Sequence, residues 1–198
     1  MFQRHIKNTV IATACLFFMA ACNTAPEKTD ASQSKFANAP KNYPLALSAA
    51  QQGKTNHAIK LLTEITQHNP GYSPAITNLG LQLLKTDNYD DAEKQLKKAL
   101  ELNPKNAVAY NHLGVISRMN GDFDTARSQY QKAIQYNPDY ANAHLNLGIL
   151  LDIYLYELDD ALQHYEKYQS LTNNSDKVVS KWIIDIQRRI KANQNKAL

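Results

Sequence analysis

The side chains of this sequence that are best suited to chemistry are a set of histidines. The five beyond the N-terminal segment are His57, His68, His112, His144 and His164. No two of them have the i, i+4 spacing that places two imidazoles on one helix face to bind a metal. His112 and His144 could approach from neighbouring helices, but two histidines without a carboxylate form a weak site. We therefore expect no metal and no cofactor held by these side chains.

An acidic cluster is the second candidate for chemistry. It comprises Asp152, Glu157, Asp159 and Asp160. These residues fall in a predicted turn between two helices, where helix caps and solvated charge are the usual explanation. The sequence has neither a phosphate-binding glycine-rich loop nor a Gly-x-Ser-x-Gly motif. We therefore predict that the protein is not an enzyme.

The N-terminal segment has the pattern of a targeting signal. Arg4 and Lys7 precede an apolar run of 11 residues from Thr9 to Met19, which is shorter than the ~20 residues that cross a bilayer. The segment ends in Met-Ala-Ala-Cys at residues 19–22, which resembles the bacterial lipobox. The resemblance implies a signal peptide over residues 1–21 and a lipid, such as palmitate, on Cys22. A plain secretory signal cleaved after Ala21, or a cytosolic protein with an apolar N-terminus, are the alternatives.

The residues after Cys22 bear on location. Residues 22–40 are rich in Ala, Ser, Thr, Asn and Pro, which favours a flexible tether. In the lipoproteins that this segment resembles, Asp after the acylated cysteine retains the protein at the inner membrane. Asn23 stands there instead, which favours the outer membrane and its periplasmic face.

Composition excludes several classes of protein. The formal charge of +4, from 22 basic and 18 acidic residues, is too mild to indicate a nucleic-acid partner. Cys15 and Cys22 are the only cysteines, which excludes a disulfide framework. A hydrophobic content of 43% is compatible with one soluble domain.

The elements that would position these side chains follow a repeat. The dipeptide Asn-Pro recurs at 69–70, 103–104 and 137–138, a spacing of 34 residues. The surrounding pattern resembles the tetratricopeptide repeat, or TPR. The resemblance implies an all-α, right-handed solenoid of about four helix-turn-helix repeats over residues 41–172. The units are 39–72, 73–106, 107–140 and 141–174, and a capping helix and tail occupy 173–198.

Glycines in register indicate close helix packing. Gly80, Gly114 and Gly148 recur in the first helix of successive repeats, and we expect them to face Ala92 and Ala126 on the second helices. Asp90 and Asp124, or the polar residues two before them, are expected to cap the second helices. Repeat 4 has one extra residue, which we place in its turn. Apolar side chains in helical register over 176–190 predict the capping helix, with Trp182 beside them.

The resemblance also implies that the first helices line a concave groove for a partner. The residues predicted to line it are Tyr43, Leu47, Thr77, Leu81, Leu84, Lys85, Asn111, Val115, Arg118, Met119, Leu145 and Ile149. This strip is apolar with polar edges and would suit a protein or peptide ligand. Arg118 is the best single cation for an acidic group of a ligand. Asn78 matches one residue of the TPR carboxylate clamp, but the other clamp positions do not match.

Together these features predict a non-catalytic adaptor, anchored by lipid at the outer membrane and facing the periplasm. It is similar to small TPR lipoproteins that serve type IV pilus or secretion machines. An alternative is a structural subunit that self-associates as a homo-oligomer in an envelope complex. An accessory protein of a TonB-type energy-transduction system is a further alternative.

Overall fold

Helices alternate with short turns throughout residues 39–196, the part of the chain that the structure, a computed structural model, describes. The helices are α2 (Tyr43–Gln51), α3 (Thr55–His68), α4 (Ser73–Leu84), α5 (Tyr89–Leu102), α6 (Ala107–Met119), α7 (Phe123–Tyr136), α8 (Ala141–Ile149), the π-helical turn η1 (Leu150–Leu155), α9 (Leu158–Leu171) and α10 (Lys177–Lys196). The predicted signal peptide, Cys22 and most of the tether lie outside the described residues.

Helix boundaries follow the capping signals of the sequence. Asn88 and Asp122 precede α5 and α7, and their side chains accept hydrogen bonds from the backbone N–H groups of Asp91 and Thr125. The residues two before Asp90 and Asp124 are therefore the caps, as one of the two alternatives predicted. Asp90 and Asp124 lie in the first turns, where their negative charge interacts favourably with the helix dipole.

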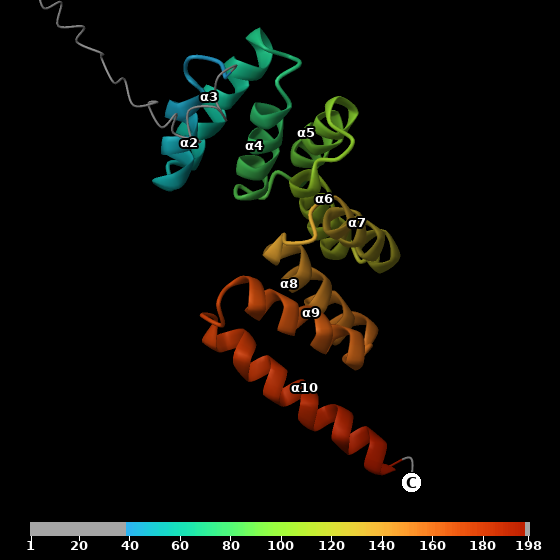
Figure 1. Ribbon diagram of the computed structural model, residues 1–198. Coiled ribbons are helices and arrows are strands. Elements are labelled where there is room, and N and C mark those ends of the chain that lie inside the picture. Colours follow the sequence, from blue (N-terminus) through green and yellow to red (C-terminus); the bar gives the residue numbers. More distant parts are fainter. Residues whose placement is uncertain (1–38, 197–198) are drawn as a thin grey trace, which may run out of the picture. The chain divides into compact units, whose positions relative to one another are not determined.

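The helices are arranged as consecutive hairpins (Figure 1). Helix α2 packs on α3, α4 on α5, α6 on α7 and α8 on α9, and each second helix also contacts the first helix of the next hairpin. Residues 38–198 form one compact unit, and its apolar clusters lie within that unit. The all-α repeat solenoid is thus confirmed, and this unit has a core of its own.

The repeated glycines permit close contact, chiefly with a larger side chain than the alanines that we expected, although a Cβ on Gly80 would also lie 3.3 Å from the carbonyl oxygen of Ala92. A Cβ built on Gly80 would lie 2.9 Å from Cγ of Leu96, and one on Gly114 would lie 2.6 Å from Cε1 of Tyr130. A Cβ on Gly148 would lie 2.7 Å from Cδ1 of Tyr165. The large side chain of the next turn, rather than the facing alanine, is therefore what requires glycine.

Repeat 4 accommodates its extra residue within a helix. The end of its first helix is the π-helical turn Leu150–Leu155, and Tyr156 then adopts a left-handed conformation with φ 57°. A π-turn accommodates one additional residue in a helix, so the predicted placement in the turn is wrong. Because Asp152 lies in this π-turn and is 6% exposed, its expected role as a cap or solvated charge is also wrong.

Helix α10 covers the last repeat. Asp176 caps it by accepting hydrogen bonds from the backbone N–H groups of Val178 and Val179. Val179 and Ile186 are fully buried against the core that α9 and η1 share, and Ile183 and Ile190 pack at its edge. The predicted capping helix is confirmed, and it extends six residues beyond Ile190.

Candidate functional site

Most of the residues predicted to line the groove are accessible on the first helices. We call these accessible residues the first-helix face. They are Leu47, Leu81, Leu84, Lys85, Val115, Arg118, Met119, Leu145 and Ile149. Met119 is the most open apolar member, at 52% exposure. The others that are apolar keep part of their surface accessible, and all of them except Leu81 pack on the core clusters.

Tyr43, Thr77 and Asn111 are buried, so the prediction that they line an exposed surface is wrong. Their exposures are 3%, 6% and 1%. Each binds an asparagine of the same or the neighbouring repeat. Asn78 donates to the Tyr43 hydroxyl at 2.6 Å, Asn106 to Thr77 Oγ1 at 2.8 Å, and Asn146 to Asn111 Oδ1 at 2.9 Å. These polar residues therefore hold repeats together rather than face a partner.

Burial also affects the ionisation of this polar layer. Desolvation, with a smaller effect of Tyr72, raises the pKa of Tyr43 to about 12, so that its hydroxyl remains protonated at neutral pH. Asn78, the residue that matched one position of a carboxylate clamp, donates hydrogen bonds to this hydroxyl and to the carbonyl of Pro74. It is a structural residue in this fold.

Arg118 is positioned by tyrosines. Its guanidinium donates to the hydroxyls of Tyr130 and Tyr154, both at 3.4 Å, and lies 5.7 Å from the centre of the Tyr154 ring. Burial alone would lower the pKa of Arg118, but these two hydroxyls raise it overall. Since its hydrogen-bond partners are neutral, Arg118 keeps its full positive charge next to Met119.

A pocket of about 270 Å³ lies where the first-helix face meets α10, and we call it the terminal pocket. Its lining comprises Ile149, Asp152, Ile153, Tyr165, Trp182, Asp185 and Arg189. Ile153 and Trp182 are 53% and 38% exposed. Asp152 at its base accepts from Arg189 at 2.6 Å and from the Tyr165 hydroxyl at 3.4 Å. Burial, and then the charge of Asp152, raise the pKa of Tyr165.

The sequence did not predict most of this pocket. Ile149 was predicted, and Ile153 and Asp152 follow Met119 and Arg118 by 34 residues in the same predicted columns. Trp182 and Arg189 come from α10, and Asp152 lies in the π-turn, for which the sequence has no local signal. The register of the repeats therefore predicts the lining only as far as Ile153.

The histidines form one pair, and it is not the predicted approach of His112 to His144. His144 and His164 lie with their Nδ1 atoms 3.0 Å apart, and His144 Nε2 lies 3.0 Å from the carbonyl oxygen of Pro138. A carbonyl only accepts, so His144 Nε2 carries a proton and its Nδ1 accepts from His164 Nδ1. Within residues 39–196, no group of three or more His, Cys, Asp or Glu side chains is placed to hold a metal.

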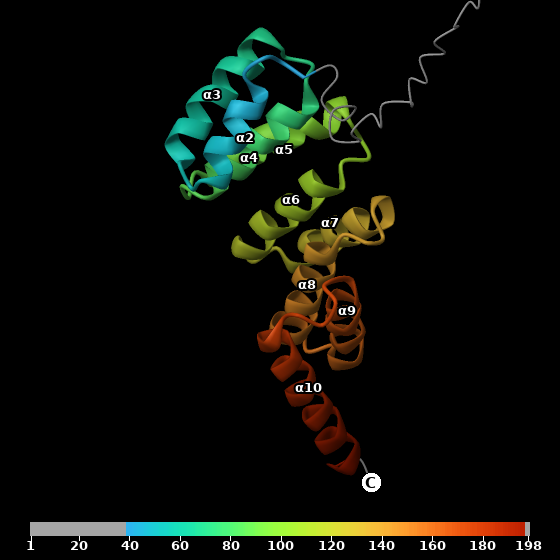
Figure 2. The ribbon, with the colours of Figure 1, turned by 60° about the vertical axis from the view of Figure 1, so that its left-hand side comes forward.

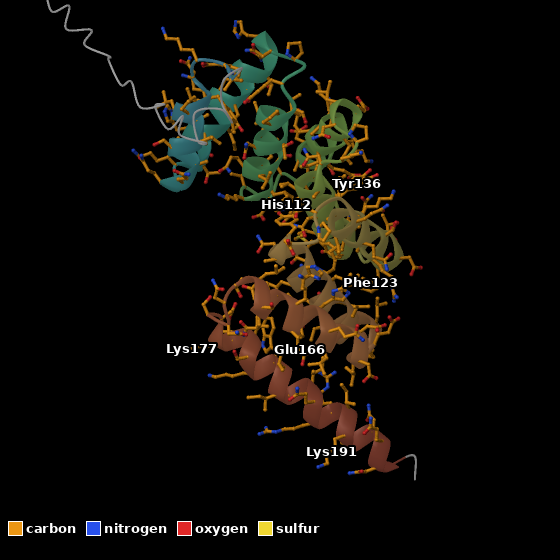
Figure 3. The ribbon with its side chains drawn as sticks, in the orientation of Figure 1. His112, Phe123, Tyr136, Glu166, Lys177 and Lys191 are labelled. Atoms are coloured by element: carbon orange, nitrogen blue, oxygen red, sulfur yellow. The ribbon has the colours of Figure 1, made fainter. Side chains whose placement is uncertain are left out.

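His112 lies apart from this pair. Its burial lowers the pKa of its imidazole to about 4, so the side chain is neutral at neutral pH. His112 is labelled in Figure 3, where it lies on α6. Burial is the whole cause of this lowered pKa, because no hydrogen bond or charge within the described residues contributes to it.

Helices long and apolar enough to traverse a bilayer are absent from the part of the chain that the structure describes.

Comparisons with known families find the same repeat twice. A model described as "Tetratricopeptide repeat" matches residues 49–114, and one described as "TPR repeat" matches residues 116–151. The comparison with curated proteins finds no significant match.

Solved structures resemble the chain in fold. One, from the functional characterization of pilF of Pseudomonas aeruginosa, is 21% identical with a TM-score of 0.67, over 76% of this chain and 68% of that one. The crystal structure of the MamA protein is 24% identical with a TM-score of 0.57, over 74% and 84%. A TPR of Spaghetti (RPAP3) bound to an HSP90 peptide is 20% identical with a TM-score of 0.55, over 60% and 93%.

Proposed function

Since the chain belongs to the tetratricopeptide-repeat family, we propose that it is a non-catalytic adaptor that binds a protein or peptide partner on its first-helix face. TPR domains bind protein or peptide partners, and the TPR of Spaghetti (RPAP3) is bound to an HSP90 peptide in its solved structure. The surface that would carry binding in this chain is the accessible strip of the first helices.

One observation carries the proposal. Leu47, Leu81, Val115 and Ile149 occupy the same position in four successive repeats, and all four remain partly exposed. When a partner covers this repeated apolar surface, the buried area stabilises the complex by roughly 25 cal/mol for each Å². Lys85 and Arg118 supply positive charge at its edge.

The location is part of the same proposal. We propose that Cys22 carries a lipid that anchors the protein at the outer membrane, facing the periplasm, and that the partner belongs to an envelope machine of the pilus or secretion type. The lipobox-like residues 19–22 support the anchor. The similarity in fold to the pilF protein of Pseudomonas aeruginosa supports a partner of the pilus type.

The anchor is tested at Cys22. In cells supplied with labelled palmitate, Cys22→Ser is expected to lose the label, because serine lacks the thiol that would be acylated. Without acyl chains the protein should also leave the membrane fraction, since lasting attachment needs two such chains or more. Cys15→Ser is the matched control, since it removes the other cysteine and should remain labelled. Label that persists in Cys22→Ser would show that the assignment of the anchor is wrong.

The binding face is tested with a double substitution. Leu81→Asp with Val115→Asp places two charges on the strip and is expected to lower the yield of the captured partner at least tenfold, since desolvating a charge opposes binding. Capture is measured by cross-linking intact envelopes, affinity purification and mass spectrometry. Both side chains are partly exposed, so the helical circular dichroism should change little.

The control places the same charges elsewhere. Leu102→Asp with Gln131→Asp alters exposed positions on the second helices α5 and α7 and should leave capture unchanged. Equal capture by both double variants would move the binding site off the first-helix face. A dimer of residues 38–198 in size-exclusion chromatography that Leu81→Asp and Val115→Asp dissociate would favour the self-associating subunit instead.

A further inference from the structure

Positive charge is concentrated in α10. Residues 39–176 carry 12 basic and 15 acidic side chains, whereas Lys177–Lys196 carries six basic and one acidic side chain. The repeats are therefore slightly acidic and the capping helix is strongly basic. Segregation of charge on one amphipathic helix is typical of a surface that meets an anionic partner.

Four of these cations lie on one face of the helix. Lys177, Lys181, Ile184, Arg188 and Lys191 follow each other at intervals of four and three residues, which places them along one line of an α-helix, and we call them the outer stripe. All five are exposed, Ile184 at 49%. From Lys177 to Lys191 the stripe is about 21 Å long at the rise of an α-helix.

The outer stripe faces away from the protein. The opposite face of α10, with Val179 and Ile186 at its centre, is the one buried against the last repeat. Figures 1 and 2 show that α9 covers one side of α10 and leaves the other side open. Figure 3 labels Lys177 near the start of the helix and Lys191 toward its end.

These cations have no acidic partner in the described part of the protein. The one acid of α10, Asp185, lies 3.7 Å from Arg189, and Arg189 is held at 2.6 Å by Asp152 of η1. Lys177, Lys181, Arg188 and Lys191 form no ion pair within residues 39–196. Intramolecular pairing therefore does not account for the concentration of charge on this face.

Exposed apolar side chains accompany the cations. Ile184 lies within the stripe, and Val178, at 55% exposure, lies beside Lys177 at its start. A nucleic acid would be bound by the cations alone and would gain nothing from Ile184 or Val178. A phospholipid surface offers both anionic headgroups and an apolar boundary into which such side chains insert.

We propose that the outer stripe of α10 docks on the anionic phospholipid headgroups of a membrane surface. This interaction is additional to partner binding on the first-helix face and does not depend on a lipid at Cys22. It would lay the capped end of the solenoid against a bilayer.

The test uses residues 38–198, which form a compact unit with its own core, and vesicles of defined composition. The fragment is expected to co-sediment with equimolar phosphatidylglycerol–phosphatidylcholine vesicles and not with phosphatidylcholine vesicles. Added salt should weaken the binding.

Charge reversal locates the surface. Lys181→Glu with Arg188→Glu is expected to lower the affinity for the anionic vesicles at least tenfold, since each cation near such a surface contributes several-fold. Lys60→Glu with Lys105→Glu changes the net charge equally at exposed positions away from α10 and should bind like the unaltered fragment. Equal affinity of the two double variants would overturn the proposal.

A second variant separates lipid from other anions. Ile184→Ser keeps every cation and is expected to lower vesicle affinity several-fold, because the apolar contact is lost. A single-stranded oligodeoxynucleotide serves as the competing probe. The proposal is overturned if Ile184→Ser binds the vesicles unchanged, or if the oligonucleotide binds more tightly than the vesicles through Lys181 and Arg188.

Discussion

Replacing Gly114 by valine is expected to destabilise residues 38–198 by about 3 kcal/mol, the upper part of the range for overpacked cores. A Cβ at this position would lie 2.6 Å from Cε1 and 2.7 Å from Cδ1 of Tyr130. Tyr130 is fully buried and its hydroxyl binds Arg118, so its ring has little room to move. The loss would appear as a lower midpoint in urea denaturation.

Two further variants make this result specific. Gly71→Val is the matched control, because a Cβ on Gly71 meets nothing within 4 Å, and its midpoint should change little. Tyr130→Ala removes the ring that the new side chain would meet. In a double-mutant cycle, the cost of Gly114→Val should therefore fall when Tyr130 is alanine. A cost that is the same in both backgrounds would mean that the two residues do not determine each other's packing.

Acidification from pH 6.5 to 4.5 is expected to destabilise the same fragment, with His112 as the largest single contributor. The pKa of His112 is about 4 in the folded protein, against about 6.5 for an unfolded chain. Between these values the unfolded chain binds a proton that folded His112 does not. Stability therefore decreases as pH falls, by on the order of 2 kcal/mol between pH 6.5 and 4.5.

Other titratable groups also contribute to the pH dependence of stability. Burial lowers the pKa of His144 and of His164, so both add to the loss of stability in acid. Asp139 and Lys167 face His144 and oppose each other, and Asp160 faces His164. Hydrogen bonds, first of all that from the backbone N–H of Val179, lower the pKa of Asp176, so its contribution is lost only at more acidic pH.

The contribution of His112 is isolated by substitution. His112→Gln should flatten the dependence of the free energy of unfolding on pH between 6.5 and 4.5. His57→Gln changes an exposed histidine and should leave that dependence as it is in the unaltered fragment. If His112→Gln retained the full slope, the acid sensitivity would have to come from the His144–His164 pair.

The repeat could be predicted from the sequence because it depends on local signals that recur. The glycines, the Asn-Pro dipeptides and the caps each act within one hairpin, so their 34-residue spacing is visible without a structure. Whether a given side chain on the predicted face is buried or exposed could not be predicted in this way. Thr77 and Asn111 occupy the predicted face, but asparagines 29 and 35 residues away draw them below the surface.

The terminal pocket could not be predicted for a related reason. Arg189 meets Asp152 across 37 residues, and Asp152 lies in a π-turn for which the sequence has no local signal. The pairing of His144 with His164 likewise joins two helices, at a separation of 20 residues that is not a multiple of the repeat. Contacts that depart from the period leave no trace in the periodic pattern of the sequence.

The π-turn of repeat 4 has a consequence for how such an array can change in length. Gly148 still meets Tyr165 as Gly114 meets Tyr130, although the chain between them is one residue longer. The surplus is taken up in one widened helical turn that ends at Tyr156. A single-codon insertion near the end of a first helix is thus absorbed where it occurs, and the hairpins on either side keep their spacing.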